Sequence, residues 1–266
     1  MPVLTWATHH RLLALGLGIT VVVAMLALGI WFLVFRSPVT QVDLSQALRL
    51  YRQNQRPGTS ARDARLPPPG VYRYRTSGSE QLSVGGITRT FPSETELVVT
   101  DARCATMEWE PFEQHIEGLV ECPVAGGALS IESAPTYEEI AGTQSTTDIR
   151  CPSDAYLVPP VPTIGERWKA TCTSTGTSVS FAGQIIGTST VTVGDQRVPA
   201  LHVRVSLVLS GAESGSNPSD YWLSAQSGVV LRQRETVDLR QQSGPLGAVR
   251  YSEAMTITLD SLTPAH

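Results

Sequence analysis

Charged side chains are scarce in this sequence. Asp, Glu, Lys and Arg make up 17% of its 266 residues, against roughly 25% in an average soluble domain. Lysine is nearly absent, because nineteen of the twenty basic residues are arginine and the single lysine is Lys169. Asparagine occurs only at Asn54 and Asn217. This bias is typical of a GC-rich genome and indicates an actinobacterial source, but it carries no information about mechanism.

Positive charge is lacking in the larger part of the chain. Residues 71–266 carry thirteen basic and twenty-two acidic side chains, a net charge of −9, whereas residues 1–70 carry seven arginines and two aspartates, a net charge of +5. Nucleic-acid binding needs a basic surface that displaces counterions. The acidic part therefore argues against nucleic acid as a partner. The basic segment favours contact with the anionic headgroups of a lipid bilayer.

The motifs of common enzymes are also missing. The sequence has no GxSxG, HExxH, P-loop or GxGxxG motif. Of the five histidines, His9, His10 and His266 lie near the ends, which leaves His115 and His202. We therefore expect no enzyme, no catalytic residue, no cofactor and no metal. A cleft that joined either remaining histidine to a carboxylate and a nucleophile would reopen the enzyme hypothesis.

One long stretch has no charge at all. It runs from Leu12 to Phe35 between Arg11 and Arg36. At about 1.5 Å per residue, a helix of this length crosses a hydrocarbon core of roughly 30 Å. We expect an uncleaved transmembrane helix over residues 12–35. The alternative is a cleaved signal peptide, whose apolar region would be shorter and followed by small residues.

The direction of this helix depends on two opposing features. Arg36, Arg49 and Arg52 follow the helix, and the positive-inside rule alone would place the large domain in the cytoplasm. The tail of residues 1–11 is too short to hold a folded domain, and the four cysteines are typical of disulfides, which persist outside the cytoplasm. We expect a single-pass protein of the cell membrane, with its N-terminus cytoplasmic and its large domain extracytoplasmic.

Residues 36–70 form the juxtamembrane segment. Leu44, Leu48 and Tyr51 recur at helical spacing and predict a short amphipathic helix starting near Asp43. This helix could lie on the membrane or dock on the following domain. The Pro-rich stretch of residues 57–70 is expected to be a stiff, extended linker.

From residue 71 to residue 266 the apolar pattern has a period of two. Leu201, Val203 and Val205, for example, alternate with polar residues after a turn at Gly194-Asp195. No segment past residue 70 shows a long helical period, and short turns favour antiparallel pairing. We expect an all-β domain of roughly eleven short strands in one large antiparallel meander. This sheet could cover its apolar face as a sandwich, as a barrel or half-barrel, or by curling around a ligand.

The four cysteines allow three pairings. Because neighbouring strands favour local closure, we expect the disulfides Cys104–Cys122 and Cys151–Cys172. A zinc site would require closely spaced cysteine pairs or neighbouring histidines, and the sequence has no such pair.

Two glutamates fall on the apolar face of their strands. Glu253 is in phase with Tyr251 and Ile257, and Glu235 is in phase with the apolar residues of its own strand. A buried carboxylate is costly unless it is paired or faces a wet cavity. We expect Glu235, Glu253, Tyr251 and Trp222 to line an interior pocket, unless a β-bulge returns the glutamates to solvent.

Residues 217–232, NPSDYWLSAQSGVVLR, carry a family resemblance. An aromatic strand at Tyr221-Trp222, a tight turn at Gly228 and an apolar strand ending at Arg232 resemble exported β proteins of the LolA/LppX type and TapB-like periplasmic families. The resemblance covers roughly residues 165–262 and implies a large antiparallel sheet curled around an apolar interior. The whole chain, with its anchor, Pro-rich linker and four cysteines, also resembles uncharacterised actinobacterial single-pass membrane proteins.

These features together predict a membrane-tethered extracytoplasmic domain that binds a lipid or another apolar ligand. The alternative is a structural or interaction protein of the cell envelope, which binds a protein partner through its β surface. A hollow interior would favour the first hypothesis and a filled interior the second.

Overall fold

The computed structural model describes residues 39–55, 65–83, 86–101, 103–140, 143–242 and 248–266. Its contacts divide the chain into a larger unit, Val39–Glu139 with Gln144–His266, and a smaller one, Met1–Pro38 with Ile140–Thr143. The transmembrane helix expected over residues 12–35 lies outside the described residues. Within the described ranges, no helix is both long and apolar enough to cross a membrane.

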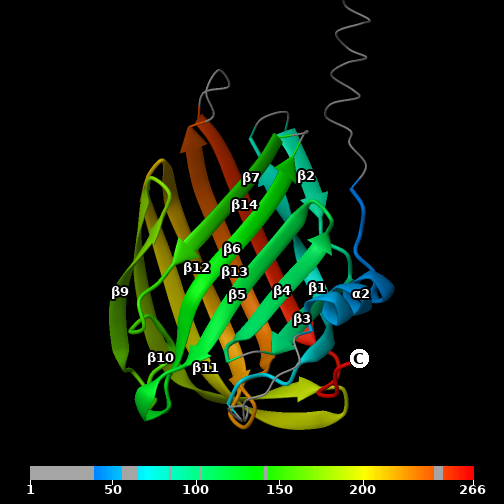
Figure 1. Ribbon diagram of the computed structural model, residues 1–266, viewed down its shortest axis with the longest axis vertical. Helices are drawn as coiled ribbons and strands as arrows, with labels where there is room; N and C mark the ends of the chain where they lie inside the picture. Colours follow the sequence, from blue (N-terminus) through cyan, green and yellow to red (C-terminus); the bar gives the residue numbers. More distant parts are fainter. Residues whose placement is uncertain (1–38, 56–64, 84–85, 102, 141–142, 243–247) are drawn as a thin grey trace, which may run out of the picture. The chain divides into compact units, whose positions relative to one another are not determined.

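The larger unit is built on one antiparallel sheet (Figure 1). Its strands are β1 (Gly70–Leu82), β2 (Ile87–Thr90), β3 (Glu94–Asp101), β4 (Ala105–Phe112), β5 (His115–Pro123), β6 (Leu129–Ile140), β7 (Thr143–Arg150), β8 (Tyr156–Val158), β9 (Arg167–Ser174), β10 (Thr177–Val193), β11 (Gln196–Gly211), β12 (Glu213–Ser224), β13 (Val230–Gln242) and β14 (Ala248–Leu259). A short 3-10 turn, η2 (Ala125–Gly127), precedes β6.

The expected strand number was wrong. The described residues form fourteen strands rather than about eleven, and β10 and β11 are 17 and 16 residues long rather than short. The difference has a physical reason in strands such as β7, whose sequence TQSTTDIR is almost entirely polar. A strand this polar shows no alternation of apolar and polar residues. Its own sequence therefore does not predict that it joins the sheet.

The sheet closes on itself. Consecutive strands pair from β9 to β14, and β14 then pairs with β1 from Tyr74↔Leu259 to Leu82↔Tyr251. On the other side, β7 and β9 are paired at Arg150↔Thr173. As a result, β4 to β7, in green, lie across from β11 to β14, in yellow to red (Figure 1). The expected all-β antiparallel sheet is confirmed, and it covers its apolar face by forming a ring of hydrogen-bonded strands.

Alternation along the strands turns apolar side chains toward the inside of the ring. On β10, Val179 and Phe181 are fully buried, and on β11 Val203 and Val205 are buried as their phase predicts. The turn between these two long strands is the expected Gly194-Asp195, because Val193 pairs directly with Gln196. Gly194 has a φ of 55°, which a two-residue hairpin of this kind requires.

The predicted amphipathic helix is α2 (Leu44–Asn54), and it docks on the sheet rather than standing free. Asp43 caps its N-terminus, since Oδ1 accepts the Gln46 N–H at 2.8 Å and the Gln46 side chain accepts the Asp43 N–H at 3.1 Å. Tyr51 is buried against β1 and β3. Leu66, from the end of the expected Pro-rich linker, is also buried in the core.

Both expected disulfides are present, Cys104–Cys122 and Cys151–Cys172. The first joins the start of β4 to the end of β5, beside the paired residues Ala105 and Glu121. The second joins the residue after β7 to β9, beside the Arg150↔Thr173 pair. This second disulfide therefore fastens the ring where its strand pairing is shortest among the described residues.

Candidate functional site

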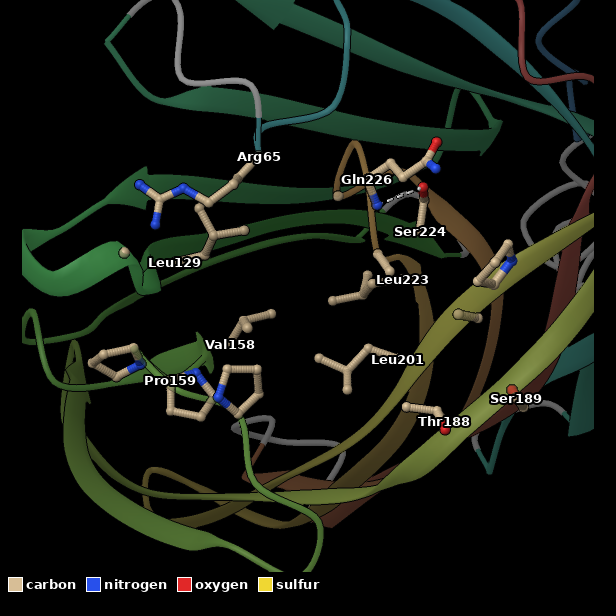
Figure 2. Close-up of a pocket in the computed structure, with 17 residues that line it drawn as sticks. Arg65, Leu129, Val158, Pro159, Thr188, Ser189, Leu201, Leu223, Ser224 and Gln226 are labelled. Carbon is tan, nitrogen blue, oxygen red and sulfur yellow. Dashed lines mark hydrogen bonds between the residues drawn. The ribbon is translucent and has the colours of Figure 1, made fainter.

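The ring holds an apolar cavity of about 550 Å³ that is open to solvent, since lining residues such as Pro160, Thr188 and Gln226 are exposed (Figure 2). Aliphatic side chains from β6, β8, β11 and β12 line it, and so do four prolines. The main lining residues are Leu129, Val158, Leu201, Leu223, Pro159, Pro160, Pro162 and Pro199. Ser224 and Gln226 add polar groups (Figure 2). Ligand cavities commonly measure about 300–1,000 Å³ and are mostly apolar with a few polar groups, so this cavity has the size and lining of a binding site.

A second cavity of about 140 Å³ lies further along the same strands. On β6, Leu129 lines the first cavity, whereas Ile131 and Thr136 line the second. On β12, Leu223 lines the first cavity and Tyr221 the second. Because each residue advances a strand by about 3.3 Å, the two cavities follow one another along the inside of the ring.

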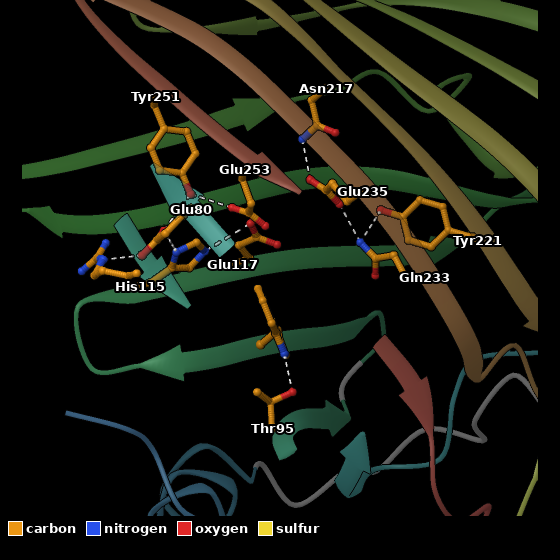
Figure 3. Close-up of polar contacts among 12 residues, drawn as sticks. Glu80, Thr95, His115, Glu117, Asn217, Tyr221, Gln233, Glu235, Tyr251 and Glu253 are labelled. Atoms are coloured by element: carbon orange, nitrogen blue, oxygen red, sulfur yellow. Dashed lines mark hydrogen bonds and ion pairs between the residues drawn. The ribbon is translucent and has the colours of Figure 1, made fainter. Parts of the chain in front are cut away.

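The second cavity is also mostly apolar, but its lining includes carboxyl and amide groups. Glu117 and Glu235 line the second cavity together with Asn217 and Gln233. Glu235 accepts hydrogen bonds from Asn217 Nδ2 and from Gln233 Nε2, both at 2.6 Å (Figure 3). Burial raises the pKa of Glu235, and the negative charge of Glu117 raises it further. The second cavity therefore offers carboxyl groups to the polar end of a ligand.

Next to Glu117, a buried charged cluster surrounds His115 (Figure 3). The Nδ1 of His115 lies 2.7 Å from Glu80 Oε2, and its Nε2 lies 3.2 Å from Glu117 Oε1. The rings of Phe91 and Trp109 pack edge-on against the imidazole. Burial lowers the pKa of His115, but the hydrogen bonds to Glu117 and Glu80 outweigh it, so the pKa is raised well above its usual value.

Glu80 and Glu253 face one another across the strand pair that closes the ring. They are directly paired residues of β1 and β14, and both are buried. The Tyr251 hydroxyl lies 2.8 Å from Glu80 Oε2 and 2.6 Å from Glu253 Oε2 (Figure 3). Arg89 forms an ion pair with the other carboxylate oxygen of Glu80.

The two glutamates cannot both carry a negative charge without cost, because like charges directly opposite in a sheet destabilise it. Burial, and then the charge of Glu117, raise the pKa of Glu253 well above its usual value. Burial also opposes the charge on Glu80, but His115 and Arg89 outweigh it and lower the pKa of Glu80. These pKa shifts favour the protonated form of Glu253 beside an ionised Glu80, and the Tyr251 hydroxyl lies within donating distance of both carboxyl groups.

Three of the four residues predicted to line a pocket lie inside the ring. Glu235 and Glu253 are 5% and 3% exposed, so no bulge returns them to solvent. Glu235 lines the second cavity, while Glu253 and Tyr251 belong to the charged cluster beside it.

Trp222, the fourth residue, lines neither cavity, and its neighbour Tyr221 lines the second. Adjacent residues of a strand point to opposite faces, and Trp222 instead stacks on His202 with ring centroids 4.3 Å apart. His202 is only partly exposed and lies 2.7 Å from Asp220, so it is paired rather than simply solvated.

Sequence reasoning missed the cluster around His115. A signal for it exists on β5, where His115, Glu117, Leu119 and Glu121 share the period-two phase of the inner face. A histidine and two glutamates in phase with a leucine indicate an inward polar row. The partners from β1 and β14 could not be identified in this way.

The buried carboxyl group of Glu121 should make the free energy of unfolding depend on pH. Both of its carboxylate oxygens are buried without a hydrogen-bond partner among the described residues, and burial raises its pKa to about 8. A raised carboxyl pKa favours the folded state below about pH 4.5, and this stability is lost as the pH rises toward 8. We expect Glu121→Gln to leave the free energy of unfolding unchanged near pH 4.5 and to raise it by about 4 kcal/mol at pH 8, since one pKa unit corresponds to about 1.4 kcal/mol. Urea denaturation across this pH range measures the difference, and equal effects at both pH values would contradict it.

The fold defines the class of protein, an all-β, disulfide-bearing domain with one antiparallel sheet that closes into a ring of hydrogen-bonded strands. No family model and no curated protein matches the chain. A solved structure with similarity is that of the hypothetical lipoprotein YmcC from Escherichia coli K12. It is 13% identical, the match covers 85% of this chain and 99% of that one, and the TM-score is 0.35. A TM-score this low does not establish a shared fold.

Proposed function

We propose that this protein is a membrane-tethered, extracytoplasmic binding domain that holds a lipid or another apolar ligand inside its ring of strands. The observation that carries the proposal is the apolar cavity of about 550 Å³. Small apolar ligands usually bind in concave, mostly apolar pockets of about 300–1,000 Å³. A ring filled with side chains at this place would offer no such space.

The order of the two cavities supports an amphipathic ligand. An acyl chain or similar apolar part would occupy the first cavity, among Leu129, Leu201 and Leu223. Its polar end would then lie toward Glu117 and Glu235 in the second cavity. Burying the apolar part would favour binding by about 25 cal/mol for each Å² removed from water.

The tether and the location are part of the same proposal. The helix expected over residues 12–35 would hold the domain at the membrane, with residues 1–11 in the cytoplasm. Two disulfides support an oxidising compartment, because disulfides rarely persist in the cytoplasm. The resemblance of residues 165–262 to the LolA/LppX type supports an apolar ligand. An anchored domain fits a receptor better than a carrier that shuttles between membranes.

A bulky side chain placed in the first cavity should prevent ligand binding. We expect Leu201→Trp to lower the affinity for a fluorescent fatty-acyl probe at least about tenfold, because the indole would occupy space that the apolar chain needs. The measurement is a fluorescence titration of the full chain in detergent, with near-ultraviolet circular dichroism to verify the fold.

Val208→Trp is the matched control, because Val208 lies on the same strand but is 51% exposed. We expect this variant to bind the probe like the wild type. Equal affinity of all three proteins would show that the probe binds outside the cavity and would refute the proposed function.

A further inference from the structure

We propose that Glu80, His115 and Glu253 form a binding site for a divalent transition-metal cation inside the ring. The three side chains come from β1, β5 and β14, and all three are buried. One ligand atom from each residue can be chosen so that the three atoms lie within 4.8 Å of one another. The site is separate from the apolar cavity and goes beyond the proposed function.

The distances fit a metal ion only after the side chains rotate. Zinc binds imidazole nitrogen and carboxylate oxygen at about 2.0–2.2 Å in a tetrahedral arrangement, so two of its ligand atoms lie roughly 3.4 Å apart. Ligand atoms as much as 4.8 Å apart would have to approach one another by more than about 1 Å, which requires rotation of the glutamate side chains. Ion pairs and hydrogen bonds already hold Glu80 and His115 in place.

An unpartnered oxygen points to a missing ligand. Glu253 is 3% exposed, and its Oε2 is bonded to Tyr251. Its Oε1 is buried and has no hydrogen-bond partner among the described residues. A buried carboxylate oxygen without a partner is costly, and a cation bound beside it would supply the missing interaction.

The charge around the site also favours a cation. Glu117 and Glu138 face the same histidine as Glu80 and Glu253, which brings four carboxyl groups together. Arg89 offsets only one negative charge through its ion pair with Glu80. A dication would offset two more, so these carboxylates could be ionised together.

The donor set indicates which cation binds. One imidazole nitrogen and two carboxylate oxygens suit Zn²⁺ or Mn²⁺, whereas Ca²⁺ and Mg²⁺ prefer sites made of oxygen alone. Arg89 and Tyr251 contact the carboxylates of Glu80 and Glu253 and would hold them in orientation.

Metal binding can be measured on the full chain in detergent without a histidine tag. His9 and His10 are replaced by alanine first, because adjacent histidines in the tail could bind metal themselves. The chain is stripped with EDTA and titrated with Co²⁺, whose visible absorption reports its ligands. We expect one Co²⁺ per chain, displaced by Zn²⁺ and unaffected by Ca²⁺.

Substitutions distinguish binding at these three residues from non-specific attraction of cations to the acidic interior. We expect Glu253→Gln and His115→Gln to weaken Co²⁺ binding roughly 100-fold. Glu121→Gln is the matched control, because Glu121 is an equally buried and unpartnered carboxyl outside the three-residue group, and it should leave binding unchanged. Absence of binding by the parent chain, or equal binding by the Glu253 and Glu121 variants, would overturn the proposal.

If the ligand variants fail to fold, X-ray absorption spectroscopy of the Co²⁺-loaded parent chain identifies the ligands of the bound metal. The proposed site predicts a shell with one imidazole and the rest oxygen. A shell without imidazole would overturn the site.

Discussion

Replacing Glu80 by glutamine is expected to lower the free energy of unfolding by about 4 kcal/mol, because it removes the anion between two buried positive groups. Arg89 and His115 both contact the Glu80 carboxylate, and they are 9% and 1% exposed. Without the carboxylate, the guanidinium and the imidazolium would stay buried without their main counterion. Urea denaturation at pH 7 in EDTA measures the loss.

Glu96→Gln is the control for this prediction. Glu96 is also buried and lies near an arginine, but its partner Arg73 is 44% exposed and 3.8 Å away. Water can solvate that guanidinium when the carboxylate is removed, so we expect a loss below about 1 kcal/mol. If the two variants lost equal stability, the Glu80 cluster would not be a coupled buried network.

Removing the disulfide Cys151–Cys172 by a double alanine substitution is expected to cost about 3 kcal/mol, as cross-links closing loops of this size do. Its removal should also loosen the ring locally, in addition to lowering the overall free energy of unfolding. This disulfide lies beside Arg150↔Thr173, where β7 meets β9. We expect amide hydrogen exchange to accelerate along β7 and β9, because few hydrogen bonds would then hold this side of the ring.

The disulfide Cys104–Cys122 provides the comparison within the same chain. It closes a loop of similar length, 18 against 21 positions, but β4 and β5 also pair directly over several residues. Its removal should cost a similar free energy and leave exchange in β7 and β9 unchanged. Identical exchange patterns in the two double variants would contradict the role assigned to Cys151–Cys172.

The sequence was informative wherever a local rule acts. Alternation predicted the inward faces of β10 and β11, and the same phase correctly placed Glu235 and Glu253 inside. Cysteine spacing predicted both disulfides, because neighbouring strands bring such residues together. The amphipathic helix followed from three apolar residues at helical spacing.

The sequence did not predict contacts that depend on how the sheet closes into a ring. Tyr251 and Glu80 are 171 positions apart, and only the pairing of β14 with β1 brings them together. That pairing also sets Glu80 opposite Glu253, which no local pattern reveals. Tyr221 and Trp222 are adjacent aromatic residues that point to opposite faces of β12, and the sequence alone does not show which of them lines the cavity.

If the ring of strands binds a ligand, native mass spectrometry should detect that ligand on the purified domain. Residues 39–266 would be exported in the protein's own host and purified without detergent, alongside the Leu201→Trp and Val208→Trp variants. We expect a bound molecule of defined mass on the wild type and on Val208→Trp, and its loss from Leu201→Trp. A wild-type domain that carries only its own mass in repeated preparations, and that also fails to take up added lipid, would contradict the proposed function.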